Sequence, residues 1–142
     1  MQRTASESIL RDLEEIINAT LAEMPLPYQK GNSIRIKNII IRKSSNGYLI
    51  YDSKINKQLA RTHFKSSAIA LAKNAAIGID VVKQIKQLDA ELLKHYNDSV
   101  FYLRTIRNSE TTLFVKNIRK TRLGISLDQT KYIRQQIDDF IF

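Results

Sequence analysis

The segment from Asp80 to Arg107 constrains the fold of this chain more than any other stretch of its sequence. Its apolar residues recur at steps of three or four, which is the spacing of one narrow stripe along an α-helix. Asp80 is a suitable N-cap, and Asn108–Ser109 is a natural stop. We therefore expect a helix of at least about seven turns, with another part of this chain or another copy lying along it. The stripe consists of Val82, Ile85, Leu88, Leu92, Tyr96, Val100, Leu103 and Ile106.

An amphipathic helix is also expected at the start of the chain, over residues 1–24. Thr4 and Glu7 have the spacing of a capping box, and apolar residues then recur at helical spacing as far as Met24. Pro25–Pro27 ends this helix in a short extended connector.

A change of period after Ser33 predicts an antiparallel sheet. Residues 34–43 and 48–51 are rich in β-branched and aromatic side chains, and Asn46-Gly47 between them favours a two-residue hairpin loop. With that loop, Lys43 is expected opposite Ile50, and Arg42 opposite Tyr51. Residues 58–62 add a short third strand.

Both faces of this sheet are expected to be apolar. An antiparallel sheet that is open to water on one side alternates more cleanly, so we expect helices or another subunit on the second face. One face carries Ile39, Ile41, Tyr48 and Ile50, and the other carries Ile40, Leu49 and Tyr51.

Two further helices complete the prediction. Ser66 is expected to cap a helix that Gly78 ends. Residues 112–142 are expected to be helical nearly throughout, with Phe114, Ile118, Ile125, Ile133, Ile137 and Ile141 near one face. The alternative is a break at Gly124, with Ser126 capping a separate last helix.

The fold class that follows is α+β in a single domain of residues 1–142. It has an N-terminal helix (1–24), a basic module of three antiparallel strands and a covering helix (30–78), and a long helical hairpin (80–142). No apolar run reaches membrane-spanning length, so no membrane partner is expected. The chain has no cysteine, which excludes disulfides, thiolate metal sites and cysteine nucleophiles.

Positive charge is concentrated in one part of the chain. The net charge is +9, and residues 30–73 carry ten basic and one acidic side chain, which by themselves give +9. Such a concentration attracts polyanions or acidic surfaces. The alternative is a basic surface that only aids solubility, with the tyrosines in the core.

Aromatic residues are interleaved with these basic residues, so the stretch is a candidate nucleic-acid-binding surface. Basic side chains meet phosphates, and aromatic faces stack on bases. The candidate residues are Lys30, Arg35, Lys37, Arg42, Lys43, Tyr48, Tyr51, Arg61, His63 and Lys65.

Signals for enzymatic chemistry are weak, and we expect a non-enzymatic protein without metal or cofactor. The sequence has no glycine-rich phosphate loop, dinucleotide fingerprint or His-Glu metal motif. His63 and His95 lack metal-ligand spacing, and the pair Asp138-Asp139 is expected to be a solvated acidic patch.

Four segments of the chain resemble small uncharacterised proteins of large contractile-tailed marine phages of the cyanophage kind, and their ocean-metagenome relatives. The resemblance implies a viral context and transfers no site residue. The segments are residues 27–36, 60–74, 93–98 and 138–142.

Two functions are therefore expected. The first is nucleic-acid binding through the basic hairpin surface. The second is a structural or assembly role in a phage particle, through protein contacts of the helices. A homo-oligomer, with a dimer favoured, and contacts with other phage proteins are expected in either case. The expected location is the cytoplasm of the infected host cell or the virion.

Overall fold

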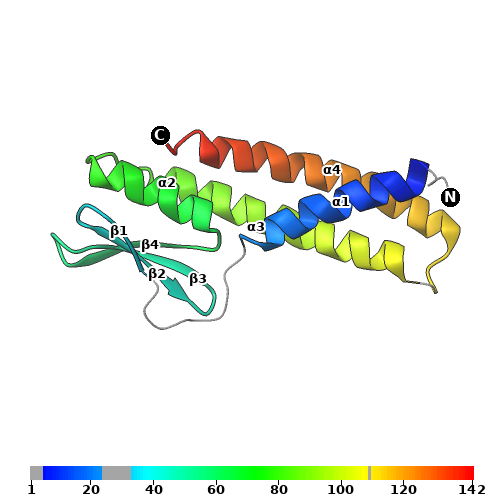
Figure 1. The fold of residues 1–142 in the computed structure, drawn as a ribbon, viewed down its shortest axis with the longest axis horizontal. Helices are drawn as coiled ribbons and strands as arrows, with labels where there is room; N and C mark the ends of the chain where they lie inside the picture. Colours follow the sequence, from blue (N-terminus) through cyan, green and yellow to red (C-terminus); the bar gives the residue numbers. More distant parts are fainter. Residues whose placement is uncertain (1–4, 24–32, 109) are drawn as a thin grey trace. The chain divides into compact units, whose positions relative to one another are not determined.

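The computed structural model describes residues 5–23, 33–108 and 110–142 of the chain (Figure 1). In these residues, four helices accompany one four-stranded antiparallel sheet, which confirms the α+β class. The predicted capping residue Thr4, the connector Pro25–Pro27 and the candidate site residue Lys30 lie outside the described residues. The elements are α1 (Ala5–Leu21), β1 (Ser33–Ile36), β2 (Ile39–Ser44), β3 (Gly47–Asp52), β4 (Lys57–Thr62), α2 (Lys65–Ala76), α3 (Val82–Arg107) and α4 (Leu113–Asp138).

The described chain divides into two compact units. We call Glu23–Leu93 together with Ile133–Phe142 the sheet unit, and Met1–Ala22 together with Lys94–Tyr132 the helix unit. Both long helices contribute one part to each unit. None of the helices within the described ranges is long and apolar enough to cross a membrane.

The sheet has four strands in the order β1-β2-β3-β4, so the prediction of three strands is wrong. The run expected as one strand over residues 34–43 turns back at Lys37-Asn38, where Lys37 adopts a φ of 53°. The side-chain amide of Asn38 donates to Asp52 Oδ1 at 2.8 Å. The backbone carbonyl oxygen of Asn38 accepts from the backbone N–H of Ser53 at 2.9 Å. These contacts join residues about fourteen positions apart, so the local pattern could not indicate them.

The loop between β2 and β3 consists of Ser45 and Asn46, one residue earlier than predicted. Lys43 therefore pairs with Tyr48 and Arg42 with Leu49, so the predicted register is wrong by two residues. Because side chains alternate with a period of two, the division into two faces is unchanged. Gly47 follows the loop, and a Cβ on it would lie 2.1 Å from the carbonyl oxygen of Thr62 on β4.

Helix α2 packs on one face of the sheet (Figure 1). Ser66 does not cap it: Phe64 occupies the N-cap position, and Ser66 is buried with its hydroxyl 3.5 Å from the carboxylate of Glu23. The predicted end at Gly78 is confirmed, with a φ of 83°. The N–H groups of Gly78 and Ile79 donate to the carbonyl oxygens of Ala75 and Asn74, which is the Schellman arrangement.

Helix α3 confirms the prediction of a long helix after Asp80. The Asp80 carboxylate caps its N-terminus by accepting from the backbone N–H of Val82 at 3.1 Å. The apolar stripe is largely covered by the chain itself, so it does not need another copy. Its buried members are Ile85, Leu92, Tyr96, Leu103 and Ile106.

Helix α4 runs without a break through Gly124, so the alternative of two helices is wrong. Ser126 is buried and bonds to the carbonyl oxygen of His95 at 2.9 Å instead of capping a helix. The predicted apolar face of α4 is buried only in its C-terminal part, because Phe114, Ile118 and Ile125 are exposed. The side chains that α4 buries are Leu123, Leu127, Ile133 and Ile137, with Ser126 and Thr130.

Each unit has its own core and its own polar ties. In the helix unit, Ile17, Leu103, Ile106, Leu123 and Leu127 form one apolar cluster, and Arg107 pairs with Glu14. In the sheet unit, the end of the chain is held against α2. Asn74 Nδ2 donates to the carbonyl oxygen of Phe140 at 3.0 Å, and Lys73 Nζ to that of Phe142 at 2.8 Å.

Gly47 and Gly124 should respond in opposite ways to replacement by alanine. Gly47→Ala forces a methyl group into the Thr62 carbonyl at a position of positive φ, and we expect a loss of about 2–4 kcal/mol. Gly124→Ala meets no atom within 4 Å and should gain about 1 kcal/mol of helix propensity. Urea unfolding of both variants at low protein concentration measures the difference. Equal free energies of unfolding for the two variants would contradict the close approach of Gly47 to the Thr62 carbonyl.

Candidate nucleic-acid interface

The strand register gathers part of the predicted site on one face of the sheet. We call the face opposite α2 the outer face. Its residues form two rows across the four strands: Arg35, Ile40, Tyr51 and Gln58 in one, and Ser33, Arg42, Leu49 and Arg61 in the other. On β2 and β3, the helix-facing side chains of Ile39, Ile41 and Ile50 are fully buried. An irregularity between Ile50 and Tyr51 shifts the β3–β4 register by one and keeps Tyr51 and Gln58 on the outer face.

Three arginines provide the charge of the outer face. Arg35, Arg42 and Arg61 are all exposed, and Arg61 donates to the hydroxyl of Ser44 at 3.3 Å. Neither Arg35 nor Arg42 forms an ion pair with a described side chain. Neither row contains an acidic residue. The guanidinium groups are therefore available to an anionic ligand, and each presents donors in a planar fork that matches phosphate.

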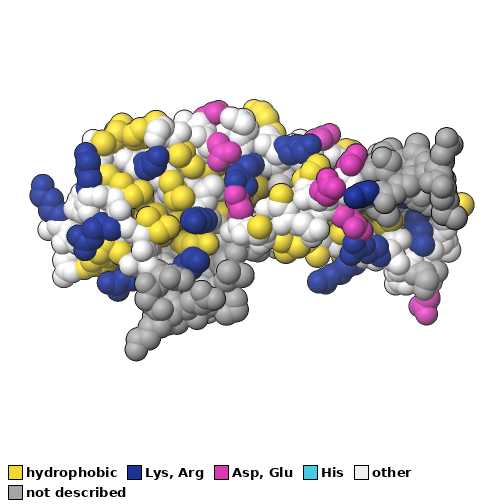
Figure 2. All heavy atoms as spheres, viewed as in Figure 1, with side chains coloured by type: hydrophobic (Ala, Val, Ile, Leu, Met, Phe, Trp, Pro, Cys, Tyr) yellow, Lys and Arg dark blue, Asp and Glu magenta, His cyan; other side chains and the backbone are white. Residues whose placement is uncertain are grey.

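Half-buried apolar side chains lie between the arginines. Tyr51 has Ile40 on one neighbouring strand and Gln58 on the other, and Leu49 separates Arg42 from Arg61. All three apolar residues keep part of their surface in contact with solvent. On the face drawn in Figure 2, basic and apolar side chains are likewise interspersed over the strands and α2. The outer face, with arginines beside half-buried apolar side chains, can therefore hold phosphates and bases together.

Other predicted site residues lie elsewhere. Tyr48 is only 4% exposed on the α2 side of the sheet, so it cannot stack on a base. Burial raises the pKa of its phenol, and the carboxylate of Glu23 raises it further. Lys43 and Lys65 line a small hollow of about 250 Å³ beside Tyr48, and Lys37 lies in the β1–β2 turn. Of the predicted site residues that the structure describes, the outer face thus brings together Arg35, Arg42, Tyr51 and Arg61.

His63 is held by a buried carboxylate that the sequence analysis missed. Asp89 on α3 is 3% exposed and accepts three hydrogen bonds. They come from the backbone N–H of His63 at 2.9 Å, the ring Nδ1 of His63 at 2.8 Å and the backbone N–H of Phe64 at 3.1 Å. The His63 side chain remains 41% exposed, and its Nε2 forms no hydrogen bond with a described residue. A signal existed, because Asp89 lies four residues after Ile85 and three before Leu92, on the apolar stripe.

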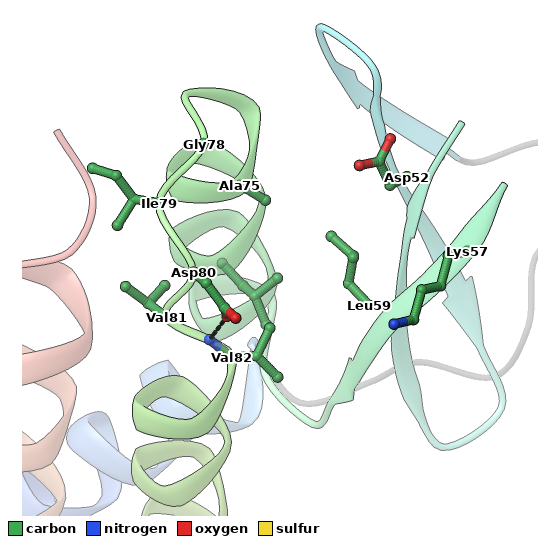
Figure 3. Close-up of a pocket in the computed structure, with 10 residues that line it drawn as sticks. Asp52, Lys57, Leu59, Ala75, Gly78, Ile79, Asp80, Val81 and Val82 are labelled. Atoms are coloured by element: carbon green, nitrogen blue, oxygen red, sulfur yellow. Dashed lines mark hydrogen bonds between the residues drawn. The ribbon is translucent and has the colours of Figure 1, made fainter. Parts of the chain in front are cut away.

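A groove of about 410 Å³ lies between the sheet and the segment that joins α2 to α3 (Figure 3). The sheet contributes the end of β3 and the start of β4. The walls of the groove are mainly apolar, with Leu59, Ile79 and Val81 among them. Its carboxylates already have partners: Asp80 accepts from Val82, and Asp52 accepts from Asn38 and the backbone N–H of Lys54. The groove therefore lacks the converging free polar groups of a specific ligand site.

Among the described residues, no three His, Cys, Asp or Glu side chains come close enough together to hold a metal ion. Comparison with protein families, with curated proteins and with solved structures finds no match to this chain.

Asp89→Ala should strongly destabilise the sheet unit. It leaves two backbone N–H groups without their acceptor at a buried position, which we expect to cost about 2–4 kcal/mol in the free energy of unfolding. Glu91→Ala is the control, because Glu91 is exposed on the same helix and should change stability by less than about 0.5 kcal/mol. Chemical denaturation followed by circular dichroism compares the two variants. A tolerated Asp89→Ala would contradict the role given to this carboxylate.

Proposed function

We propose that this chain is a non-enzymatic protein that binds single-stranded nucleic acid through the outer face of its sheet. The observation that carries the proposal is the grouping of Arg35, Arg42 and Arg61 around Tyr51 on a face without acidic residues. Arginines there contact phosphates, and the Tyr51 ring offers a stacking surface to a base. The phage context expected from the resemblance is compatible with such an activity.

Dimensions favour a single strand over a duplex groove. Neighbouring strands lie about 4.8 Å apart, so the outer two of four strands are separated by about 14 Å before their side chains are added. The major groove of B-form DNA is about 12 Å wide, which admits a helix or a two-stranded ribbon. A four-stranded face is too wide to enter flat. A single strand lying across the two rows reaches both the arginines and Tyr51.

Salt dependence tests the phosphate contacts. Each phosphate neutralised on a single strand contributes about 0.7 to the slope of log affinity against log salt concentration. Arg42→Ala should therefore weaken binding of all sequences and lower that slope by about 0.7. Fluorescence anisotropy with labelled oligonucleotides of about twelve nucleotides measures both quantities. Lys86→Ala, an exposed cation on α3, is the control and should change neither. An unchanged slope in Arg42→Ala would remove the outer face from the interface.

Stacking is tested at Tyr51 by a variant that keeps an apolar side chain in the half-buried position. Tyr51→Leu should cost about 1–3 kcal/mol of single-strand binding, the usual contribution of one base stacked on an aromatic ring. Tyr132→Leu is the control, because Tyr132 is 63% exposed in the helix unit. Thermal unfolding should show that both variants remain folded. Equal binding by Tyr51→Leu and the wild type would contradict a stacking role.

A second candidate function is a structural or assembly role in a phage particle. It is favoured by Leu113 and Phe114 at the start of α4, which are 74% and 75% exposed. Large apolar side chains left in water at one helix end suit contacts with another protein. Complete lack of nucleic-acid binding at low salt would leave this as the better proposal.

A further inference from the structure

A hollow lies between α3 and α4 within the helix unit, with an exposed apolar side chain at its edge. The hydroxyls of Ser99 and Ser126 hydrogen-bond across the two helices at 2.9 Å. Because serine side chains are small, space remains above Ser126, and a groove of about 410 Å³ opens there. Ile125 lines this groove and is itself 58% exposed. A protruding side chain and a recess thus occupy the same face.

Two side chains of opposite charge also line the groove. Asp98 on α3 and Arg122 on α4 both line it. Within the described part of the chain, neither forms an ion pair or a side-chain hydrogen bond with another side chain. Tyr102 on α3 also lines the groove and is partly exposed. The groove therefore carries one carboxylate, one guanidinium and the imidazole of His95, with one protruding apolar residue at its edge.

We propose that a second copy of this chain docks on this face, as a two-fold dimer in which each Ile125 enters the other copy's groove. A two-fold interface is self-complementary, so every contact between two different residues occurs twice. Asp98 of each copy then pairs with Arg122 of the other. The charge pattern favours a copy of the same chain over an unrelated partner, because one face already holds both members of the pair.

The size of the face predicts a weak dimer. From Ile118 to Tyr132 the helix extends about 21 Å, and two helices side by side are about 20 Å wide, which gives about 400 Å² on each copy. Stable complexes bury about 800 Å² per partner. The dimer should therefore form reversibly in the micromolar range. This proposal is independent of the outer face of the sheet.

Sedimentation equilibrium of the full chain, from about 5 μM to about 500 μM, tests the proposal. The mass of the wild type should rise from 16.4 kDa toward twice that value. Ile125→Glu should raise the dissociation constant at least about tenfold, because it places a charge in the apolar contact. Ile55→Glu is the matched control, since Ile55 is also 58% exposed but lies in the sheet unit. It should leave the dissociation constant unchanged.

Charge reversal tests the register. Asp98→Arg or Arg122→Asp alone should weaken the dimer about threefold to tenfold, and the double variant should restore it to within about threefold of the wild type. A wild type that stays at 16.4 kDa throughout the range overturns the proposal. A dimer that is indifferent to Ile125→Glu also overturns it, because the contact then lies elsewhere. Failure of the double variant to recover overturns the Asp98–Arg122 pairing.

Discussion

The sheet unit depends most on the hydrogen bonds that the carboxylate of Asp89 accepts. This carboxylate accepts from two consecutive backbone N–H groups and from the ring of His63, at the point where β4 ends and α2 begins. Helix α2 starts there without a side-chain cap of its own. A buried carboxylate is costly unless it is fully hydrogen-bonded, and three donors satisfy it. It thereby ties α3 to the junction that determines which sheet face α2 covers.

Covering one face determines what the other can do. Because side chains alternate, the burial of Ile39, Ile41 and Ile50 beneath α2 directs Arg42 and Tyr51 to the opposite side. The turn at Lys37-Asn38 then adds β1 as an edge strand and brings Arg35 to the same face. The grouping of charge around Tyr51 is thus a consequence of sheet packing. A core that buried the other face would have placed the same arginines under the helix.

Much of the architecture could be predicted from periodicity. The long helix after Asp80, the end of α2 at Gly78 and the two faces of the β2–β3 hairpin followed from residue spacing and glycine conformation. The strand count did not, because the Lys37-Asn38 turn is held by Asp52 and Ser53 from another strand. Likewise, the apolar residues of α4 form two faces, and spacing alone does not say which of them packs on the rest of the chain.

The candidate site was predictable in composition and only partly in position. The sequence by itself determined that positive charge is concentrated in residues 30–73 and that aromatic residues accompany it. It also determined the direction of each side chain relative to its own strand, since a period of two is a local property. Tertiary structure decided that Tyr48 is buried, that Lys43 and Lys65 lie apart from the arginines, and that His63 is bound to a residue 26 positions away. The physical reason is that burial and long-range hydrogen bonds depend on which elements pack together, and local spacing carries no record of that choice.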